Sequence, residues 1–217
     1  MIHYIIPARK GSKGLPFKNR KLLHHTLNTL PSDVLSQVIV STDDEFIINE
    51  CVSRDVRYLK RSAELSGDNI CIRDVMEDCI YKCGIDKQDT IVILYLTYPQ
   101  RTWDTIHKIQ TVFIDKKLDS LLCKKNPSTH PCLCFFDAGN NQGTQVIEHD
   151  LYRRQDYPSC FELSFYVCIF KVSKISTLSK NMFCEETYFF PLNDHLDIDT
   201  EQDLSKFLEE RHGYKLI

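Results

Sequence analysis

The sequence predicts an α/β fold built on a mostly parallel, doubly wound sheet with one inserted β-hairpin. Short β-rich runs alternate with segments of helical periodicity along most of the chain. Such alternation is typical of parallel sheets whose crossover connections are helices. The pattern breaks once, between residues 127 and 158, and the 217-residue chain is long enough to bury one sizeable core. We therefore expect a single domain over residues 1–217, with residues 128–158 as an insertion.

The first part of the chain supplies most of the predicted sheet. Apolar, β-branched runs predict strands at residues 2–6, 37–41, 56–59, 90–95 and 120–123. Helical periodicity predicts amphipathic helices at residues 44–53, 72–83 and 102–115. In the last of these, Ile106, Ile109 and Phe113 fall on one face. Because helices alternate with strands, they should cover both sides of the sheet.

The remaining part of the chain predicts the insertion and a return to the sheet. Residues 132–136 and 145–147 flank a turn-rich segment at 137–143, which predicts a projecting β-hairpin. Residues 161–170 form another apolar run that returns to the sheet. Thr200 should then open an amphipathic helix at residues 200–210.

Charge and hydropathy exclude two classes of partner. The formal net charge is -3, whereas proteins that bind nucleic acid usually carry a clear basic excess. We expect no nucleic-acid partner, so any bound nucleotide should be a small substrate. The chain start lacks the pattern of a signal peptide, and the apolar run at residues 91–96 is too short to span a bilayer. We expect no membrane partner and a cytoplasmic location.

The ten cysteines are predicted to be reduced thiols. Their spacings include no C-x-x-C pair, and most of them lie in apolar stretches. In a cytoplasmic protein such cysteines pack like small hydrophobic residues.

A basic, glycine-containing loop follows the first predicted strand. Residues 7–19 read Pro-Ala-Arg-Lys-Gly-Ser-Lys-Gly-Leu-Pro-Phe-Lys-Asn. The carboxyl end of a strand is where open α/β sheets bind ligands, and glycines let the backbone approach phosphate oxygens. The spacing is not that of a P-loop. On charge and glycine content alone, a solvated basic turn is equally compatible with this segment.

The order of residues in this loop resembles the signature of the acylneuraminate cytidylyltransferase family, the CMP-N-acetylneuraminic acid synthetases. The resemblance rests on Ile6-Pro7-Ala8-Arg9, Gly11-Ser12-Lys13-Gly14 and Lys18-Asn19. It continues, in order, at residues 40–44, 61–68, 97–102, 130–131 and 153–156, and then at Asp197-Ile198-Asp199-Thr200. The resemblance therefore covers nearly the whole chain and implies one Rossmann-like nucleotidyltransferase domain.

The resemblance implies a CTP site and a divalent metal. It assigns nucleotide binding to Ala8, Arg9, Gly11, Ser12, Lys18, Asn19 and Arg61. Asp197 and Asp199 match the family's Asp-x-Asp-Thr motif and are predicted to bind Mg²⁺, a cation that prefers oxygen ligands. If residues 196–199 are extended, both carboxylates lie on one face and Ile198 on the other. Without the motif, the simpler explanation of the two aspartates is that acidic residues at the start of a helix interact favourably with the helix dipole.

The sugar side departs from the family pattern. Tyr95 stands where relatives have a glutamine, and Ser164-Phe165 stands where they have Asn-Gly. We predict Tyr95, Arg154 and Ser164 as sugar-binding residues. A site built on hydrogen bonds rejects substrates that leave its polar groups unpaired, so these changes can redirect sugar specificity.

The predicted activity is transfer of CMP from CTP to the anomeric hydroxyl of an acidic α-keto sugar, with Arg9, Lys18 and Asp199 as catalytic residues. The hairpin implies a homodimer, because family members use it to reach the partner's site. Three alternatives remain. The first is a cytidylyltransferase for another sugar acid, such as Kdo, pseudaminate or legionaminate. The second is a uridylyl- or guanylyltransferase, and the third is a protein that binds sugar nucleotides without turnover. The second alternative is disfavoured, because the chain lacks the Gly-x-Gly-Thr-Arg-type loop that such enzymes usually carry.

Overall fold

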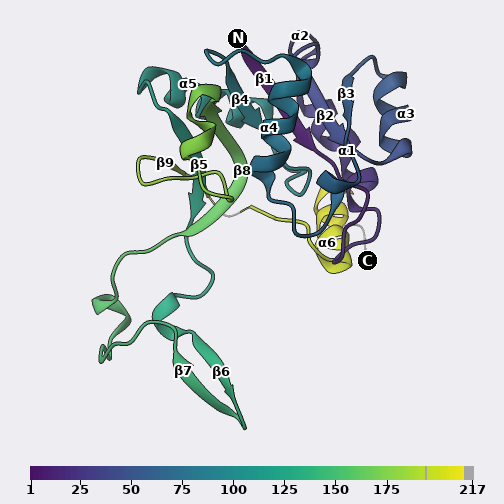
Figure 1. Ribbon diagram of the computed structural model, residues 1–217. Helices are drawn as coiled ribbons and strands as arrows, with labels where there is room; N and C mark the ends of the chain where they lie inside the picture. The colour runs from purple at the N-terminus through teal and green to yellow at the C-terminus, as the bar shows by residue number, and fades with distance from the viewer. Residues whose placement is uncertain (194, 213–217) are drawn as a thin grey trace.

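The computed structural model describes residues 1–193 and 195–212, so the last part of the predicted domain, residues 213–217, lies outside the described residues. A seven-stranded sheet in the order β3-β2-β1-β4-β8-β5-β9 forms the centre of the body, and a two-stranded hairpin, β6-β7, projects from it (Figure 1). The predicted mostly parallel α/β fold is confirmed.

The strands of the main sheet are parallel except for one. They are β1 (Ile2–Pro7), β2 (Val38–Thr42), β3 (Arg57–Lys60), β4 (Thr90–Ile93), β5 (Ser120–Lys125), β8 (Glu162–Lys171) and β9 (Tyr188–Pro191). β8 runs antiparallel between β4 and β5, whereas β9 runs parallel to β5. The sequence analysis did not predict β9.

Helices cover both faces of the sheet. They are α1 (Lys18–Thr29), α2 (Ser32–Leu35), α3 (Glu45–Ser53), α4 (Ile72–Cys83), α5 (Trp103–Asp115) and α6 (Glu201–His212). One face packs against α1, α3, α5 and α6, and the other packs against α4 and the 3-10 segment Val172–Thr177. Neighbouring residues of β1 divide accordingly, with Ile6 in the first core and Ile5 in the second. No helix in the described ranges is long and apolar enough to cross a membrane.

The order of the strands places a ligand site at one edge of the sheet. The chain leaves β1 toward β2 and β3, and then returns to the opposite side of β1 as β4. This reversal is a topological switch point, where open α/β sheets form a crevice at the carboxyl ends of their strands. The loop that follows β1 and the residues that follow β4 therefore meet at this crevice.

The inserted hairpin is present but begins later than predicted. Residues 131–133 form a 3-10 turn, and the hairpin strands are β6 (Phe135–Gly139) and β7 (Gln142–Gln145). Asn140 and Asn141 form the two-residue turn with φ of 54° and 59°, as the twist of a tight hairpin requires. The predicted strand boundaries were wrong because the turn has only two residues, so both strands extend into the segment 137–143 that had been predicted as turn.

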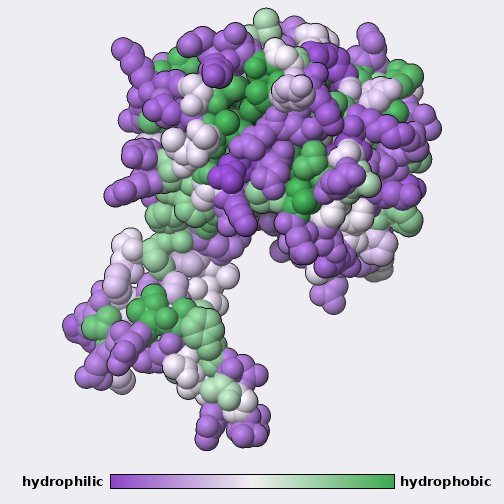
Figure 2. Space-filling view, viewed as in Figure 1, coloured by the Kyte–Doolittle hydropathy of each residue, from purple (hydrophilic) through white to green (hydrophobic). Residues whose placement is uncertain are grey.

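We call residues 126–161 the arm. It projects from the body, and hydrophobic side chains are visible on its surface in Figure 2. Its exposed large apolar residues are Leu133, Phe135, Phe136, Val146, Ile147, Leu151, Tyr152 and Phe161.

Candidate functional site

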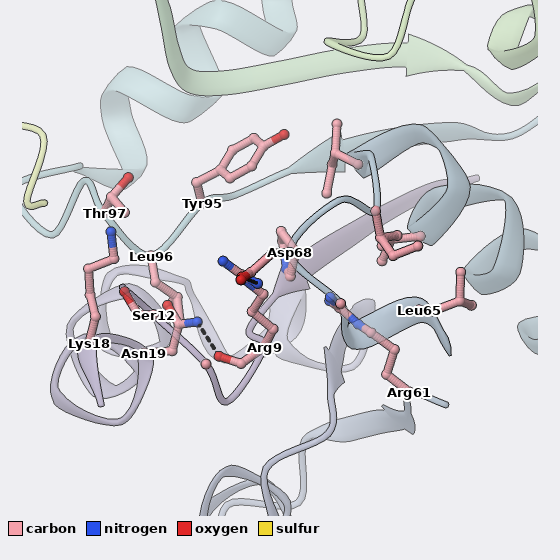
Figure 3. A pocket seen from close by; sticks show the side chains of 16 residues that line it. Arg9, Ser12, Lys18, Asn19, Arg61, Leu65, Asp68, Tyr95, Leu96 and Thr97 are labelled. Carbon is pink, nitrogen blue, oxygen red and sulfur yellow. Dashed lines mark hydrogen bonds and ion pairs between the residues drawn. The ribbon is translucent and has the colours of Figure 1, made fainter. Parts of the chain in front are cut away.

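A pocket of about 280 Å³ lies at the switch point, between the loop after β1 and the segment after β4. Arg9 and Asp68 meet in the middle of it, with Lys18 on one side and Arg61 on the other (Figure 3). Every predicted nucleotide-binding residue except Ala8 lines the pocket, as do Tyr95, Leu96 and Thr97. The fold therefore brings basic groups from separate parts of the sequence to one cavity.

Residues 41–44 hold the loop after β1 in place. The Thr42 hydroxyl donates to the Ala8 carbonyl at 2.5 Å, and the Ala8 N–H donates to the Ser41 carbonyl at 2.9 Å. The Lys10 N–H donates to the Asp43 carboxylate at 2.7 Å. Ala8 is fully buried and its N–H group is already bonded. Ala8 thus anchors the loop and has no free N–H group for a nucleotide.

Arg61 is a buried arginine held by the same segment. Its side chain donates to the Ser41 hydroxyl at 3.2 Å and to the Ser41 carbonyl at 2.9 Å. Burial lowers the pKa of its guanidinium group, although an arginine stays charged at neutral pH. Arg61 therefore presents a fixed positive charge at the wall of the pocket.

The other basic groups of the pocket are paired with carboxylates. Asp68 accepts from Arg9 at 2.6 Å and forms an ion pair with Lys13 at 2.8 Å. Lys13 and then Arg9 lower the pKa of Asp68, so it is ionised at neutral pH. Lys18 donates to Asp199 at 2.6 Å. Apart from Arg61, the basic side chains of the pocket are thus paired with carboxylates, and a polyanion must compete with Asp68 and Asp199.

The segment that carries the two predicted metal ligands is fixed to the body. Ile198 is fully buried in the first core, and its N–H donates to the Thr97 carbonyl at 2.8 Å. Asp203 accepts from the backbone N–H groups of Asp199 and Thr200 at 3.1 and 2.8 Å. The Thr200 hydroxyl in turn accepts from the Asp203 N–H, which completes a capping box at the start of α6.

Gly14 brings the loop after β1 against this segment. A Cβ atom at Gly14 would collide with the backbone carbonyl oxygen of Asp199. Only glycine permits so close an approach of two backbones. The contact places Asp199 beside Lys18 and the pocket.

Asp197 shows a feature that fits a bound cation. The Tyr98 hydroxyl donates to its Oδ2 at 2.7 Å, while Oδ1 is buried and has no hydrogen-bond partner among the described residues. A buried carboxylate oxygen without a partner is costly unless a ligand satisfies it. No group of three potential metal-binding side chains was found in the described residues. Mg²⁺ commonly binds one or two carboxylates together with substrate phosphates, so Asp197 and Asp199 fit this pattern.

The predicted sugar-binding residues lie in three different environments. Tyr95 lines the pocket, and its ring packs at 5.5 Å from that of Phe165. Ser164 is almost fully buried, and its hydroxyl lies 2.7 Å from Nε2 of His195, away from the pocket lining. Arg154 lies on the arm and is exposed. Within one chain, only Tyr95 reaches the pocket, and the roles of Ser164 and Arg154 remain predictions.

Four contributors to the site had not been singled out from the sequence. Gly14 and Asp68 stand inside the motif strings, but the sequence did not indicate the contact of Gly14 with Asp199 or the ion pairs of Asp68. Asp203 had a signal, since a threonine followed three residues later by an acidic residue indicates a capping box. Tyr98 also stands inside a motif string, but its bond to Asp197 had no signal, because the two residues lie 99 positions apart in the sequence.

Comparison with known proteins agrees with this geometry. A profile of the cytidylyltransferase family matches residues 3–210. The chain belongs to the cytidylyltransferase family. A pseudaminic acid cytidylyltransferase of Campylobacter jejuni and a CMP-N,N'-diacetyllegionaminic acid synthase of Legionella pneumophila are each 29% identical to it, over 92% of this chain and 91% of theirs.

Other relatives are longer or more distant. An N-acylneuraminate cytidylyltransferase of Streptococcus agalactiae is 28% identical over 92% of this chain, which spans about half (50%) of that relative's length. A solved CMP:2-keto-3-deoxy-manno-octonic acid synthetase in complex with CTP superposes with a TM-score of 0.69 at 14% identity, covering 98% of this chain and 99% of that one. At this identity, the superposition supports the fold alone.

Proposed function

We propose that this cytidylyltransferase transfers CMP from CTP to the anomeric hydroxyl of an acidic α-keto sugar, sialic acid or a related nonulosonate, and releases pyrophosphate. The observation that carries the proposal is the pocket that gathers Arg9, Lys18 and Arg61 at the switch point beside Asp197 and Asp199. Three relatives named for neuraminate, pseudaminate and legionaminate support this sugar class.

In the proposed reaction, the anomeric oxygen attacks the α-phosphorus of CTP as the bond to the pyrophosphate oxygen breaks. Arg9 and Lys18 offset the negative charge on the phosphates, and Arg61 holds the base and ribose side. Positioning and charge neutralisation are the main catalytic contributions in such transfers. When bound by Asp197 and Asp199, Mg²⁺ supplies further charge neutralisation and lowers the pKa of the attacking hydroxyl.

The ion pairs of the pocket indicate how binding proceeds. Arg9 exchanges Asp68 for phosphate oxygens, and Lys18 exchanges Asp199 for the same polyanion. CTP without a divalent cation would leave the Asp199 carboxylate beside the phosphates, a repulsive arrangement. We therefore expect CTP and the metal to bind cooperatively, each raising the affinity for the other.

The activity is tested by pyrophosphate release from CTP and Mg²⁺ with neuraminate, KDN, legionaminate, pseudaminate and Kdo, with UTP and ATP as controls. Turnover with CTP and one of these acids supports the proposal and names the sugar. Binding of CTP with Mg²⁺ but no pyrophosphate release with any sugar acid would favour the alternative, a protein that binds without turnover.

Asp199→Ala should lower turnover by at least about 100-fold, because it removes one of the two carboxylates that would hold Mg²⁺ beside the reacting phosphate. The exposed carboxylate of Asp115, at the end of α5, provides a matched control, and Asp115→Ala should keep full turnover. Undiminished turnover of a folded Asp199→Ala protein contradicts the metal site.

We further propose a homodimer formed through the arm, in a cytoplasmic protein. The apolar side chains exposed on the arm support this assembly, since such patches mark interfaces. In the dimer, Arg154 of one protomer would reach the sugar carboxylate in the partner's site.

A further inference from the structure

Tyr98 joins three separate segments beside the pocket. It follows β4, its side chain is almost fully buried, and its hydroxyl lies 2.7 Å from Oδ2 of Asp197. The backbone N–H of Phe165, in β8, donates to the same hydroxyl oxygen at 3.3 Å. The hydroxyl of Tyr98 is therefore bonded on two sides.

These contacts fix the direction of the hydroxyl proton. A backbone N–H can only donate, so the Tyr98 oxygen accepts from Phe165 and directs its own proton to Asp197. The two oxygens of the Asp197 carboxylate are thus not equivalent. Oδ2 is held by Tyr98, whereas Oδ1 is buried and has no hydrogen-bond partner in the described parts of the chain.

The ring of Tyr98 is also held in place. It packs against His195 at 5.4 Å and against Tyr166 at 5.7 Å. Nδ1 of His195 lies 2.9 Å from the Asn193 carbonyl, which can only accept, so this nitrogen carries a proton. In the neutral ring Nε2 then accepts from the Ser164 hydroxyl. Ser164 therefore fixes His195, and His195 limits the movement of Tyr98.

We propose that Tyr98 is a positioning residue that restricts Asp197 to coordination through one oxygen and thereby favours Mg²⁺ over Ca²⁺ in the CTP complex. Mg²⁺ requires nearly octahedral geometry, whereas Ca²⁺ accepts six to eight oxygens and carboxylates that bind through both of theirs. A carboxylate with one oxygen already bonded suits the smaller ion. The inference rests on the proposed function, because it takes Asp197 as a metal ligand.

The test compares CTP affinity in saturating Mg²⁺ and in saturating Ca²⁺, measured by isothermal titration calorimetry. Tyr98→Phe keeps the ring and removes the hydroxyl. It should weaken binding in Mg²⁺ about 10- to 100-fold, as loss of an outer-shell partner does, and should weaken binding in Ca²⁺ less. The ratio of the two affinities should therefore fall. An unchanged ratio in Tyr98→Phe protein overturns the proposal.

Tyr4→Phe is the matched control. Tyr4 is another buried tyrosine with one side-chain partner, because it accepts from Gln110 at 2.6 Å in the core of the body. Removal of the Tyr4 hydroxyl should leave the ratio of CTP affinity in Mg²⁺ to CTP affinity in Ca²⁺ unchanged. The wild-type protein gives a second measurement, since equal CTP affinity in the two metals overturns the proposal even if Tyr98→Phe does not fold.

Asp197→Asn separates this inference from the proposed metal site. If Tyr98 acts through Asp197, Tyr98→Phe should have no further effect on the ratio in the Asp197→Asn background. Asp197→Asn protein that binds CTP in Mg²⁺ as tightly as wild type overturns both the metal site and the role of Tyr98. If Asp197→Asn weakens binding but Tyr98→Phe leaves the ratio unchanged, only the role of Tyr98 is overturned.

Discussion

The body and the arm use the same kinds of side chain in opposite ways. In the body, large apolar residues from both faces of the sheet are buried, and Phe170 of β8 is fully enclosed. On the arm, Phe135 and Phe136 are 59% and 62% exposed, and Tyr152 is 95% exposed. Buried apolar surface stabilises a fold, whereas exposed apolar surface marks an interaction site.

The two regions also differ in what they contribute to the site. The body alone assembles the pocket, the basic groups and both aspartates. The arm carries Arg154 and an apolar surface, and in the proposed dimer it would contribute to the site of a second protomer. The comparison predicts that changes in the body act on folding and nucleotide binding, whereas changes in the arm act on assembly.

The largest effect should come from the core. Phe170→Ala should lower the free energy of unfolding by about 3–5 kcal/mol, because a fully buried ring leaves a cavity. Tyr152→Ala, on the arm, should change it by less than about 0.5 kcal/mol. Urea denaturation of both variants measures the difference, and similar losses for the two would contradict the distinction between body and arm.

Gly14→Ala tests the contact between the loop after β1 and Asp199. The added methyl group must push two backbones apart, which should cost about 1–3 kcal/mol of stability and weaken Mg²⁺-dependent CTP binding. Gly11→Ala is the control for stability, because its Cβ meets nothing within 4 Å. Thermal melting measures the loss of stability, and CTP titration in Mg²⁺ measures the loss of affinity. Equal melting temperatures for the two variants would show that the contact between Gly14 and Asp199 does not require glycine.

The proposed role of the arm in dimer formation is tested by measuring the oligomeric state. Replacing Phe135 and Phe136 together by Ser removes two exposed rings from the proposed interface, so sedimentation should shift from dimer to monomer. CTP binding by the body should be retained, because neither ring lies in the pocket. A double variant that remains dimeric at the same protein concentration would place the interface elsewhere, and a wild-type monomer would remove the dimer proposal.

The smallest effect concerns the cysteines, all ten of which are free thiols. Burial raises the pKa of Cys79 in α4 to about 11 and that of Cys123 in β5 to about 12. Because the thiolate is the reactive form, these two should resist iodoacetamide at pH 7.5 in the native protein. Cys134 and Cys160 on the arm are only partly buried and should be alkylated first. Mass spectrometry of labelled peptides measures the order.

The sequence by itself determined the features that depend on neighbouring residues. Alternating apolar runs predicted the strands and helices, and Thr200 marked the start of the last helix. The motif around Arg9 and Lys18 indicated the nucleotide loop, because glycine, basic residues and a preceding strand are adjacent in the chain. Local periodicity and local composition carry this information directly.

Only the tertiary structure decided how distant segments meet. The insertion of β8 between β4 and β5, the contact of Gly14 with Asp199 and the bond from Tyr98 to Asp197 depend on the order of strands in the sheet. Lys18 and Asp199 are 181 positions apart, yet they form an ion pair. Side-chain periodicity specifies which face of an element is buried, but it does not specify which other element covers that face.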